Sequence, residues 1–236
     1  MSEEELIAKS ISRETQIEDL KGGESVFLAK STLSVLKGNF VGEDQYIFEK
    51  AFESYLSFSK RIYVFEGIGN IGIEQIMQAV EKHIRIMKKK PIVLIDYLQI
   101  LSPYDIRMSD KQNIDKSVLE LKRMSRDFDI PVICISSFNR MNYTSPVSLS
   151  SFKESEAIEY SSDVLIGLQY SGMDYEEKES DVSRNSRIKA LMRNMEEQGR
   201  KGSCQDIQVK ILKNRNGSKG SICLKFYPMF NFFNDI

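Results

Sequence analysis

Apolar side chains recur at helical spacing between residues 73 and 87. They stand three and four positions apart, which places them on one stripe of an amphipathic helix. Lysines at 88–90 follow at the end that suits cations, and Pro91 ends the run. The pattern predicts a helix over 73–87 with an inward stripe of Ile73, Ile76, Met77, Val80, Ile84 and Met87.

Three short apolar runs are typical of strands: "PIVLID" (91–96), "PVICIS" (131–136) and "DVLIGL" (163–168). Runs of this kind occur where both faces of a parallel sheet are covered. Strands that alternate with helices predict an α/β fold with a largely parallel, doubly wound sheet flanked by helices. The helix between the first two runs is expected at about 113–128, with Ile114, Val118, Leu121 and Phe128 inward.

The two ends of the chain follow other patterns. Ser2 and Glu5 form a capping box, which predicts a helix over 2–20. After a helical, loop-rich stretch, "RIYVFE" (61–66) is expected to be a strand. Near the C-terminus, "DIQVKIL" and "SICLKFYP" alternate around the turn "KNRNGSKG", which predicts an antiparallel hairpin.

Composition changes between residues 174 and 201, where half of the side chains are charged. A solvated, flexible insertion is the expected structure, with a short helix near 188–198. The whole chain has 236 residues, 41% of them hydrophobic, and a formal net charge of −1. These values indicate an ordinary globular protein without a bulk positive field.

The histidine and cysteine content and the lengths of the apolar runs limit the kinds of site and the location that the chain can have. The single histidine, His83, argues against a histidine triad or a multi-histidine metal site. The three cysteines are expected to be reduced thiols in or near the core. Because there is no signal peptide and no apolar run of about 18 residues, the expected location is the cytoplasm, away from membranes.

Glycines at 67, 69 and 72 match the spacing Gly-x-Gly-x-x-Gly between a predicted strand and a predicted helix. In dinucleotide-binding turns this pattern lets the backbone approach a pyrophosphate, and an acidic residue such as Asp96 then holds a ribose. The alternative is a plain turn and helix cap that uses Gly69, Asn70 and Gly72.

Four ordered segments favour another interpretation. "PIVLIDYLQIL", "IPVICISSFNR", "SLSSFKESEAIEYSSDVLIGL" and "VKILKNRNGSKGSICLKFYPMFNFF" together resemble the C-terminal motor domain of DnaB-type replicative DNA helicases. The resemblance extends from Met1 to about Phe233, apart from the charged insertion. It implies a single RecA-like ATPase domain over 1–236, a P-loop NTPase core with a C-terminal antiparallel hairpin.

The resemblance assigns roles to particular residues. Asp96 would be the catalytic-site carboxylate that orients Mg²⁺, although a turn or helix cap is its plainer role. Lys213 and Arg215 would act on the γ-phosphate of a neighbouring subunit's nucleotide, unless the hairpin tip simply faces solvent. Further implied positions are Lys9, Gln99, Ser137 and Arg140 for the nucleotide, and Lys153, Glu154 and Glu156 for DNA.

The chain also departs from the family's pattern. Residues 1–236 contain no Gly-Lys-Ser/Thr, and the sequence starts where the family has already passed its P-loop and catalytic glutamate. Ser137 stands for a phosphate-sensing glutamine, Glu156 for a glycine, and Lys9 for an arginine. We therefore expect a motor domain truncated at its N-terminus and lacking the P-loop strand, with exposed apolar surface and unpaired strand edges.

These observations define three hypotheses. The first is part of a helicase motor that couples ATP hydrolysis to translocation on single-stranded DNA, inactive by itself and not binding ATP or Mg²⁺ tightly. Its implied partners are single-stranded DNA, further copies in a hexameric ring, primase and a helicase loader. The second is a non-catalytic ring or loader-binding module, and the third is a dinucleotide-binding enzyme that uses Gly67 to Gly72.

Overall fold

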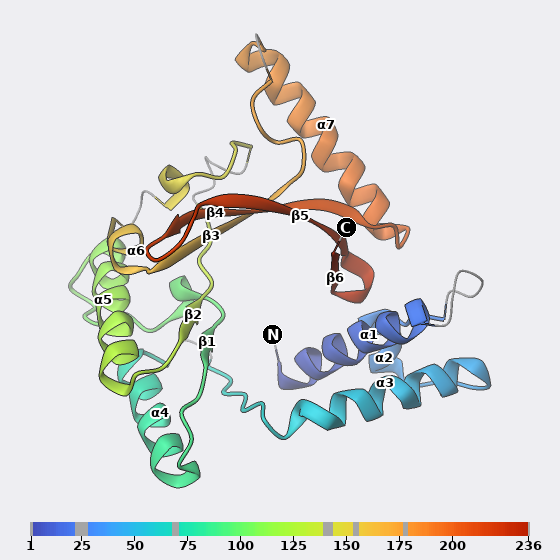
Figure 1. Ribbon diagram of the computed structural model, residues 1–236, viewed down its shortest axis with the longest axis horizontal. Helices are drawn as coiled ribbons and strands as arrows, with labels where there is room; N and C mark the ends of the chain where they lie inside the picture. The colour runs from blue at the N-terminus through green and yellow to red at the C-terminus, as the bar shows by residue number, and fades with distance from the viewer. Residues whose placement is uncertain are drawn as a thin grey trace. The chain divides into compact units, whose positions relative to one another are not determined.

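The computed structural model describes residues 2–21, 28–67, 71–138, 144–152, 156–176 and 179–235 (Figure 1). The chain divides into two compact units. The first unit contains Met1–Glu66, Tyr170–Val209 and Ile222–Ile236, and the second contains Gly67–Gln169 and Lys210–Ser221. Each unit is described by itself below.

Three helices open the first unit: α1 (Glu3–Lys21), α2 (Thr32–Lys37) and α3 (Glu43–Ser59). The expected capping box is confirmed, because the Glu5 N–H donates to Ser2 Oγ and the Ser2 N–H donates to a Glu5 carboxylate oxygen. α1 packs against both α2 and α3. Their shared core is small and contains Ala8, Ile11, Ile47 and Ala51.

The same unit holds α7 (Asp181–Arg200) and the short helix η4 (Pro228–Phe230), which α1 and α7 both contact. Ser180 caps α7 by accepting from the Ser183 N–H. α7 is longer than the helix expected at 188–198. The predicted flexibility of the 174–201 segment stays a prediction.

The strand expected at 61–66 is wrong. After α3 the chain turns through hydrogen bonds from Arg61 N–H to Phe58 O and from Ile62 N–H to Ser59 O, and no strand is assigned in this described stretch. A strand exists only with a hydrogen-bonded neighbour, and an apolar run alone does not supply one. Tyr63 and Phe65 are exposed instead.

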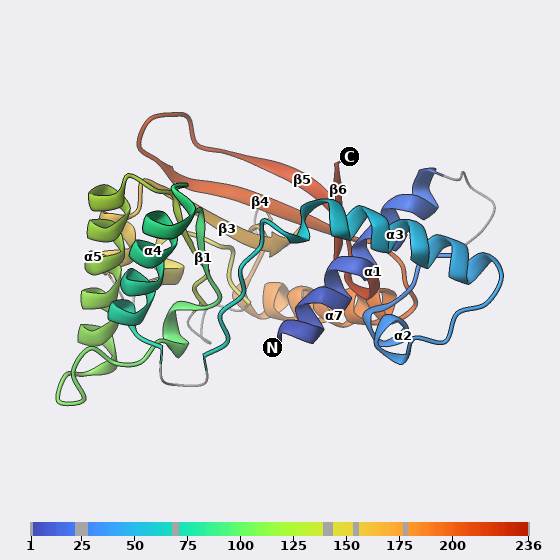
Figure 2. The same ribbon diagram turned by 90° about the horizontal axis from the view of Figure 1, so that it is seen from below.

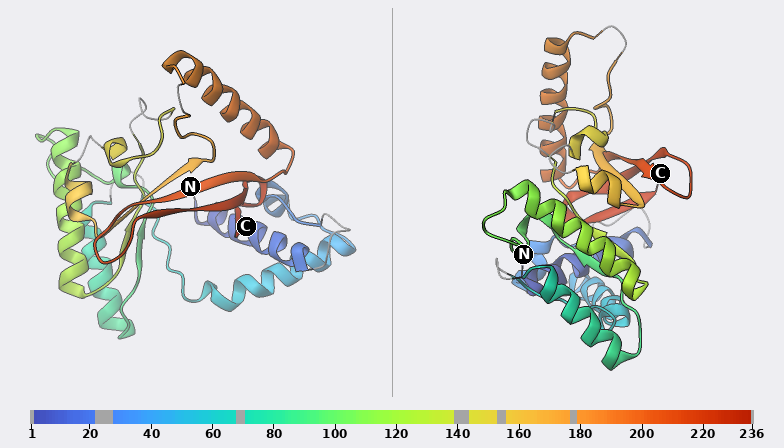
Figure 3. Two further views of the ribbon diagram at one scale, coloured as in Figure 1. Left: turned by 45° about the horizontal axis from the view of Figure 1, so that its top comes forward. Right: turned by 90° about the vertical axis from the view of Figure 1, so that its left-hand side faces the viewer.

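The second unit is built around two parallel strands, β1 (Val93–Ile95) and β2 (Val132–Cys134), in which Leu94 pairs with Ile133. The helices α4 (Ile73–Met87) and α5 (Asp110–Phe128) lie side by side on one face of this pair (Figure 2, Figure 3). The predicted succession of strand, helix and strand from β1 through α5 to β2 and both helical stripes are confirmed, except that Met87 is exposed. The buried core residues are Ile73, Val80, Ile95, Leu98, Leu121, Met124 and Ile130.

The opposite face of β1 and β2 carries four exposed apolar side chains, which we call the bare face. Leu94 is 63% exposed and Ile133 52% exposed, and Ile92 and Ile135 flank them at 69% and 46%. The expectation that these strands are buried on both faces is therefore wrong. The expectation of exposed apolar surface agrees with the structure.

The third apolar run forms β3 (Val164–Tyr170), which belongs to a different sheet with the order β3-β4-β5-β6. The Arg215 N–H donates to Asp163 O and the Ser171 N–H donates to Asp206 O, so β3 and β4 (Gln205–Asn214) run antiparallel. The predicted parallel placement of this run is wrong. Its side chains alternate between buried and exposed, which suits a sheet covered on one face.

The predicted C-terminal hairpin is confirmed. β4 and β5 (Gly220–Tyr227) are neighbours joined by the short turn 215–219. β6 (Phe232–Asp235) then pairs antiparallel with β5, in the register Phe226 with Phe233. The rings of these two phenylalanines stack at 4.3 Å between centroids.

Candidate functional site

Polar side chains gather where β1 and β2 end, in what we call the strand-end cluster: Asp96, Gln99, Ser136 and Ser137. Gln99 lies on the short helix η1 (Leu98–Ile100) that follows β1. Its amide Nε2 donates to Ser136 Oγ at 2.9 Å, and its Oε1 accepts from the Ser137 N–H at 3.3 Å. The structure therefore brings two of the predicted nucleotide residues, Gln99 and Ser137, into direct contact.

Local packing explains how this cluster forms. Leu98 is 4% exposed in the core, and its N–H donates to Ile135 O at 2.8 Å. This bond ties η1 to the chain that leaves β2. Parallel strands end at the same sheet edge, where α/β folds bind their ligands, so the exposed carboxylate of Asp96 lies at the expected edge.

The donor set of the cluster can be tested against Mg²⁺ and ATP. Carboxylate and hydroxyl oxygens are ligands that Mg²⁺ accepts, so Asp96 and the two serines fit a metal beside a phosphate. A triphosphate also needs a nest of backbone N–H groups, which the family builds from its P-loop. The cluster therefore offers oxygen ligands of the kind that Mg²⁺ accepts. It has no P-loop beside it to hold the phosphates, because residues 1–236 contain no Gly-Lys-Ser/Thr.

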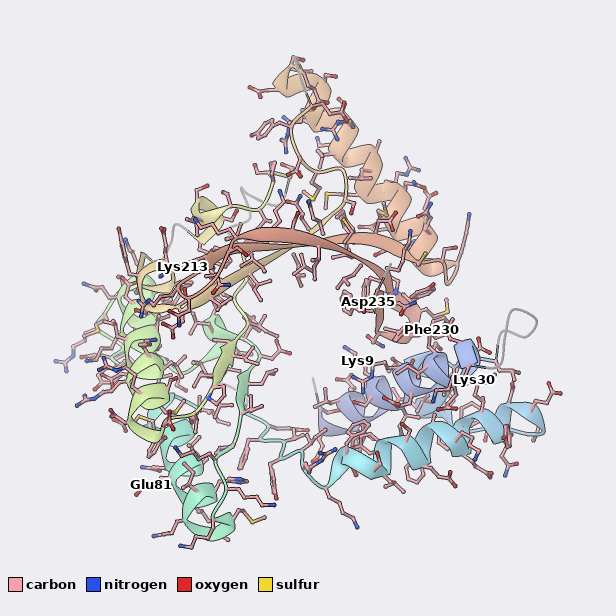
Figure 4. All side chains as sticks on the ribbon, viewed as in Figure 1. Lys9, Lys30, Glu81, Lys213, Phe230 and Asp235 are labelled. Atoms are coloured by element: carbon pink, nitrogen blue, oxygen red, sulfur yellow. The ribbon has the colours of Figure 1, made fainter. Side chains whose placement is uncertain are left out.

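A second group lies at the base of the hairpin, the hairpin-base cluster: Lys122, Asp163, Lys213 and Arg215. Asp163 Oδ2 accepts from Lys122 Nζ at 2.5 Å, and its Oδ1 lies 2.9 Å from Arg215 Nη1. Lys213, which Figure 4 labels, donates from Nζ to Glu159 O near the end of α6 (Glu156–Ser161), at 2.5 Å. Lys213 and Arg215, the two residues predicted to act on a neighbouring subunit's nucleotide, are thus both bound by the segment 159–163.

Electrostatics at Asp163 follow from these contacts. The hydrogen bond from Lys122 is the main influence that lowers the pKa of Asp163 below its usual value. Partial burial acts in the opposite direction, and the charges of Arg215 and Lys213 lower this pKa further. The carboxylate is therefore ionised at neutral pH.

The positions of the other predicted site residues are as follows. Lys9 is half-buried on α1 in the first unit, where Figure 4 labels it. Arg140, Lys153 and Glu154 lie outside the described residues, as does the side chain of Glu156 at the start of α6. Their predicted roles stay predictions.

A dinucleotide site needs a strand directly before its glycine turn. The structure assigns no strand to the described stretch 61–66, which precedes the glycine pattern. Gly72 is the N-cap of α4, and its N–H donates to the side chain of Gln75 at 3.0 Å. This supports the turn-and-cap interpretation at Gly72, while Gly69 and Asn70 lie outside the described residues.

Sequence reasoning missed Lys122, Asp163 and Ser136. Ser136 adjoins the predicted Ser137, so its neighbourhood was a usable signal. Lys122 lies 41 residues before Asp163, and no local pattern connects the two.

The described residues contain no group of three or more histidine, cysteine, aspartate or glutamate side chains placed to hold a metal ion. No helix within the described ranges combines the length and apolar character needed to cross a bilayer.

Several known proteins are similar in sequence to this chain. A Helicobacter pylori protein described as "Replicative DNA helicase DnaB" is 26% identical over 217 residues, which cover 85% of this chain and 44% of that protein. A Bacillus subtilis protein, "Replicative DNA helicase DnaC", is 27% identical over 146 residues, 60% of this chain and 27% of its own length. The chain thus spans less than half the length of these relatives.

Solved structures show the fold. "The Structure Of A DnaB-Like Replicative Helicase And Its Interactions With Primase" matches all of this chain and 50% of its own, with a TM-score of 0.72 at 24% identity. A second solved structure, described as an ATPase domain, matches all of this chain and 72% of its own, with a TM-score of 0.71 at 24% identity. The α/β, RecA-like fold expected from the sequence is confirmed.

The model of one protein family, the DnaB-like helicase C terminal domain, matches residues 1–235. This match extends over nearly the whole sequence and includes both clusters. The chain therefore belongs to the DnaB-like helicase C-terminal domain family.

Proposed function

We propose that this chain is part of a replicative DNA helicase motor that couples ATP hydrolysis to translocation on single-stranded DNA and to duplex unwinding. Family membership supports the general role. The strand-end cluster and the hairpin-base cluster support a nucleotide that is bound beside one and acted on by the other. Primase, a loader and further copies in a hexameric ring are the proposed partners, and the cytoplasm is the proposed location.

Each predicted residue has a proposed task. Asp96 would orient Mg²⁺ on the nucleotide, and Lys9, Gln99, Ser137 and Arg140 are each proposed as nucleotide-binding residues. Lys213 and Arg215 would stabilise the negative charge that develops on a neighbour's γ-phosphate, where a fixed positive charge is most effective. Lys153 neutralises a DNA phosphate, and backbone N–H groups near Glu154 and Glu156 donate to its oxygens.

One observation supports the proposal that the chain is inactive by itself. The metal-orienting carboxylate and the cationic turn are present, but residues 1–236 contain no P-loop to hold a triphosphate between them. The chain by itself should therefore neither bind ATP tightly nor hydrolyse it.

The test is a steady-state ATPase assay of the purified chain with Mg²⁺, with and without single-stranded DNA. We expect turnover indistinguishable from that of Asp96→Ala and of a blank without protein. Robust turnover that Asp96→Ala abolishes would contradict the proposed inactivity. Tight ATP binding in calorimetry that Asp96→Ala leaves unchanged would remove the proposed role of Asp96.

A non-catalytic ring or loader-binding module is the second candidate. The contacts of Gln99 favour it, because both its Oε1 and its Nε2 are already bonded within the strand-end cluster. Anisotropy of fluorescent single-stranded DNA separates the two candidates. A motor part binds DNA with a salt-dependent affinity that Lys153→Ala weakens, whereas a pure interaction module does not respond to DNA.

A further inference from the structure

We infer that Asp163 is a positioning residue that sets the direction of the Arg215 guanidinium. The inference rests on the proposed function, in which Arg215 acts across a subunit boundary. It adds a carboxylate, and a lysine behind it, to the parts that the helicase reaction requires.

The contacts of Arg215 explain its orientation. Its backbone N–H donates to Asp163 O at 2.9 Å, and its Nη1 lies 2.9 Å from Asp163 Oδ1. One residue therefore holds both the start and the end of this long side chain. A guanidinium has five N–H donors in a rigid fork, so a bond at one nitrogen, together with the anchored backbone, restricts where the others point.

Arg215 stays available while it is held. Its side chain is 52% exposed, and the ion pair with Asp163 is made through the terminal nitrogen Nη1. A phosphate oxygen can thus approach the other donors without displacing Asp163. An exposed arginine without such a partner would lose rotamer freedom only when it met the phosphate.

Lys122 links the pair of Asp163 and Arg215 to a helix of the core. It lies on α5 between Leu121 and Met124, which are 5% and 0% exposed. Its Nζ holds the second oxygen of Asp163 at 2.5 Å, so the carboxylate bridges a core helix and the hairpin turn. Lys213, anchored on Glu159 O and Tyr160 O, keeps the strand before the turn in place.

A purely stabilising role does not account for this geometry. Ion pairs between half-exposed side chains contribute little to stability, because water screens them and their ordering costs entropy. Accurate placement, in contrast, matters for a charge that must meet a transition state, where a displacement of about 1 Å costs about 100-fold in rate.

The first experiment measures Arg215 directly in the full chain by NMR of arginine Nε–H groups, with Arg215→Lys used for assignment. We expect an ordered Arg215 signal in the wild type at neutral pH and a mobile one in Asp163→Asn. Asp163→Glu should restore order, because the carboxylate is kept. Lys122→Met should loosen Arg215, whereas Lys122→Arg should not.

The matched control is Lys116→Met, which breaks the ion pair with Glu120 on the same helix, where the atoms lie 3.3 Å apart. It should leave the Arg215 signal unchanged. If Arg215 were as mobile in the wild type as in Asp163→Asn, the inference would be overturned.

The second experiment measures the consequence for the reaction. The chain is mixed with a P-loop-containing DnaB-type helicase whose own hairpin arginine is alanine, and DNA-stimulated ATPase activity is followed. We expect the wild-type chain to restore kcat, Asp163→Asn to restore about tenfold less with KM unchanged, and Asp163→Glu to restore most of it.

Together the two experiments distinguish a failure of the proposed action across subunits from a failure of the positioning role of Asp163. If wild-type chain restores no activity, the proposed action across subunits fails, while the NMR result still decides whether Asp163 holds Arg215. If Asp163→Asn restores as much activity as wild type, the positioning role is overturned even when Arg215 acts as proposed.

Discussion

Thr15 shows how a single buried hydroxyl organises the first unit. It is fully buried, and its Oγ1 donates to Ser12 O at 2.7 Å and accepts from the Lys30 N–H at 2.8 Å. Ser12 Oγ donates to Lys30 O at 2.7 Å in the same place. Both backbone groups of Lys30 are therefore satisfied by α1, which fixes the chain that leads into α2.

At this scale we predict that Thr15→Val destabilises the chain by about 1–3 kcal/mol, because the Lys30 N–H loses its acceptor inside the protein. Urea unfolding followed by circular dichroism measures the change. Ser57→Ala is the control, since Ser57 bonds Ser54 O at an exposed position, and it should stay within about 0.5 kcal/mol. Equal costs for the two variants would refute this account.

At the scale of elements, the start of α7 is fastened by one arginine. Arg187 donates from Nε and Nη2 to the two oxygens of Glu179, both at 2.8 Å, and from Nη2 to Asp174 O at 3.0 Å. The hydrogen bond from Arg187 is the main cause that lowers the pKa of Glu179. The first turns of α7 should therefore be ordered although the surrounding segment is highly charged.

This contact predicts an acid-sensitive helix start. Because the pKa of Glu179 is lowered in the folded chain, its stabilising effect is complete above the usual glutamate pKa of about 4.3. The effect is lost as pH falls through the lower folded-state value. Hydrogen exchange of amides 183–187, corrected for intrinsic rates, should speed up in that acidic window.

Glu179→Gln should produce the same loss of protection at neutral pH. Glu197→Gln is the matched control, because Glu197 pairs with Arg193 within the same helix at 3.4 Å. Unchanged protection in Glu179→Gln would show that the segment is ordered by other contacts.

At the scale of the whole molecule, the notable feature is the bare face of β1 and β2. Its apolar side chains project from a two-stranded sheet whose other face is filled by α4 and α5. Contiguous exposed apolar surface on a soluble chain promotes association. Short strands with free edges add backbone groups that can pair with another chain.

We therefore predict that the purified chain self-associates as its concentration rises. The double variant Leu94→Ser and Ile133→Ser should shift sedimentation velocity profiles towards monomer without loss of helical signal, because both side chains are more than half exposed. Val182→Ser, at a side chain 79% exposed on α7, should leave association unchanged. A monodisperse wild-type monomer would contradict this prediction.

Local patterns were sufficient for the helices and for part of the site. The stripe of α4, the capping box of Ser2 and Glu5, and Asp96 after an apolar run are each visible within a few neighbouring residues, because helix periodicity, capping and strand ends are short-range properties. The order of four motifs was likewise a property of the sequence alone. It led to the fold and family that the comparisons confirm.

The partners of each strand depended on the path of the whole chain. Nothing in "DVLIGL" distinguishes a strand of the parallel pair from one that runs antiparallel to β4, and nothing in "RIYVFE" reveals the lack of a neighbour. Lys122, Asp163 and Arg215 come from three elements, and only the folded chain brings their charges together. Pairing and ion contacts are long-range interactions, so their partners are set by topology and packing rather than by the residues beside them.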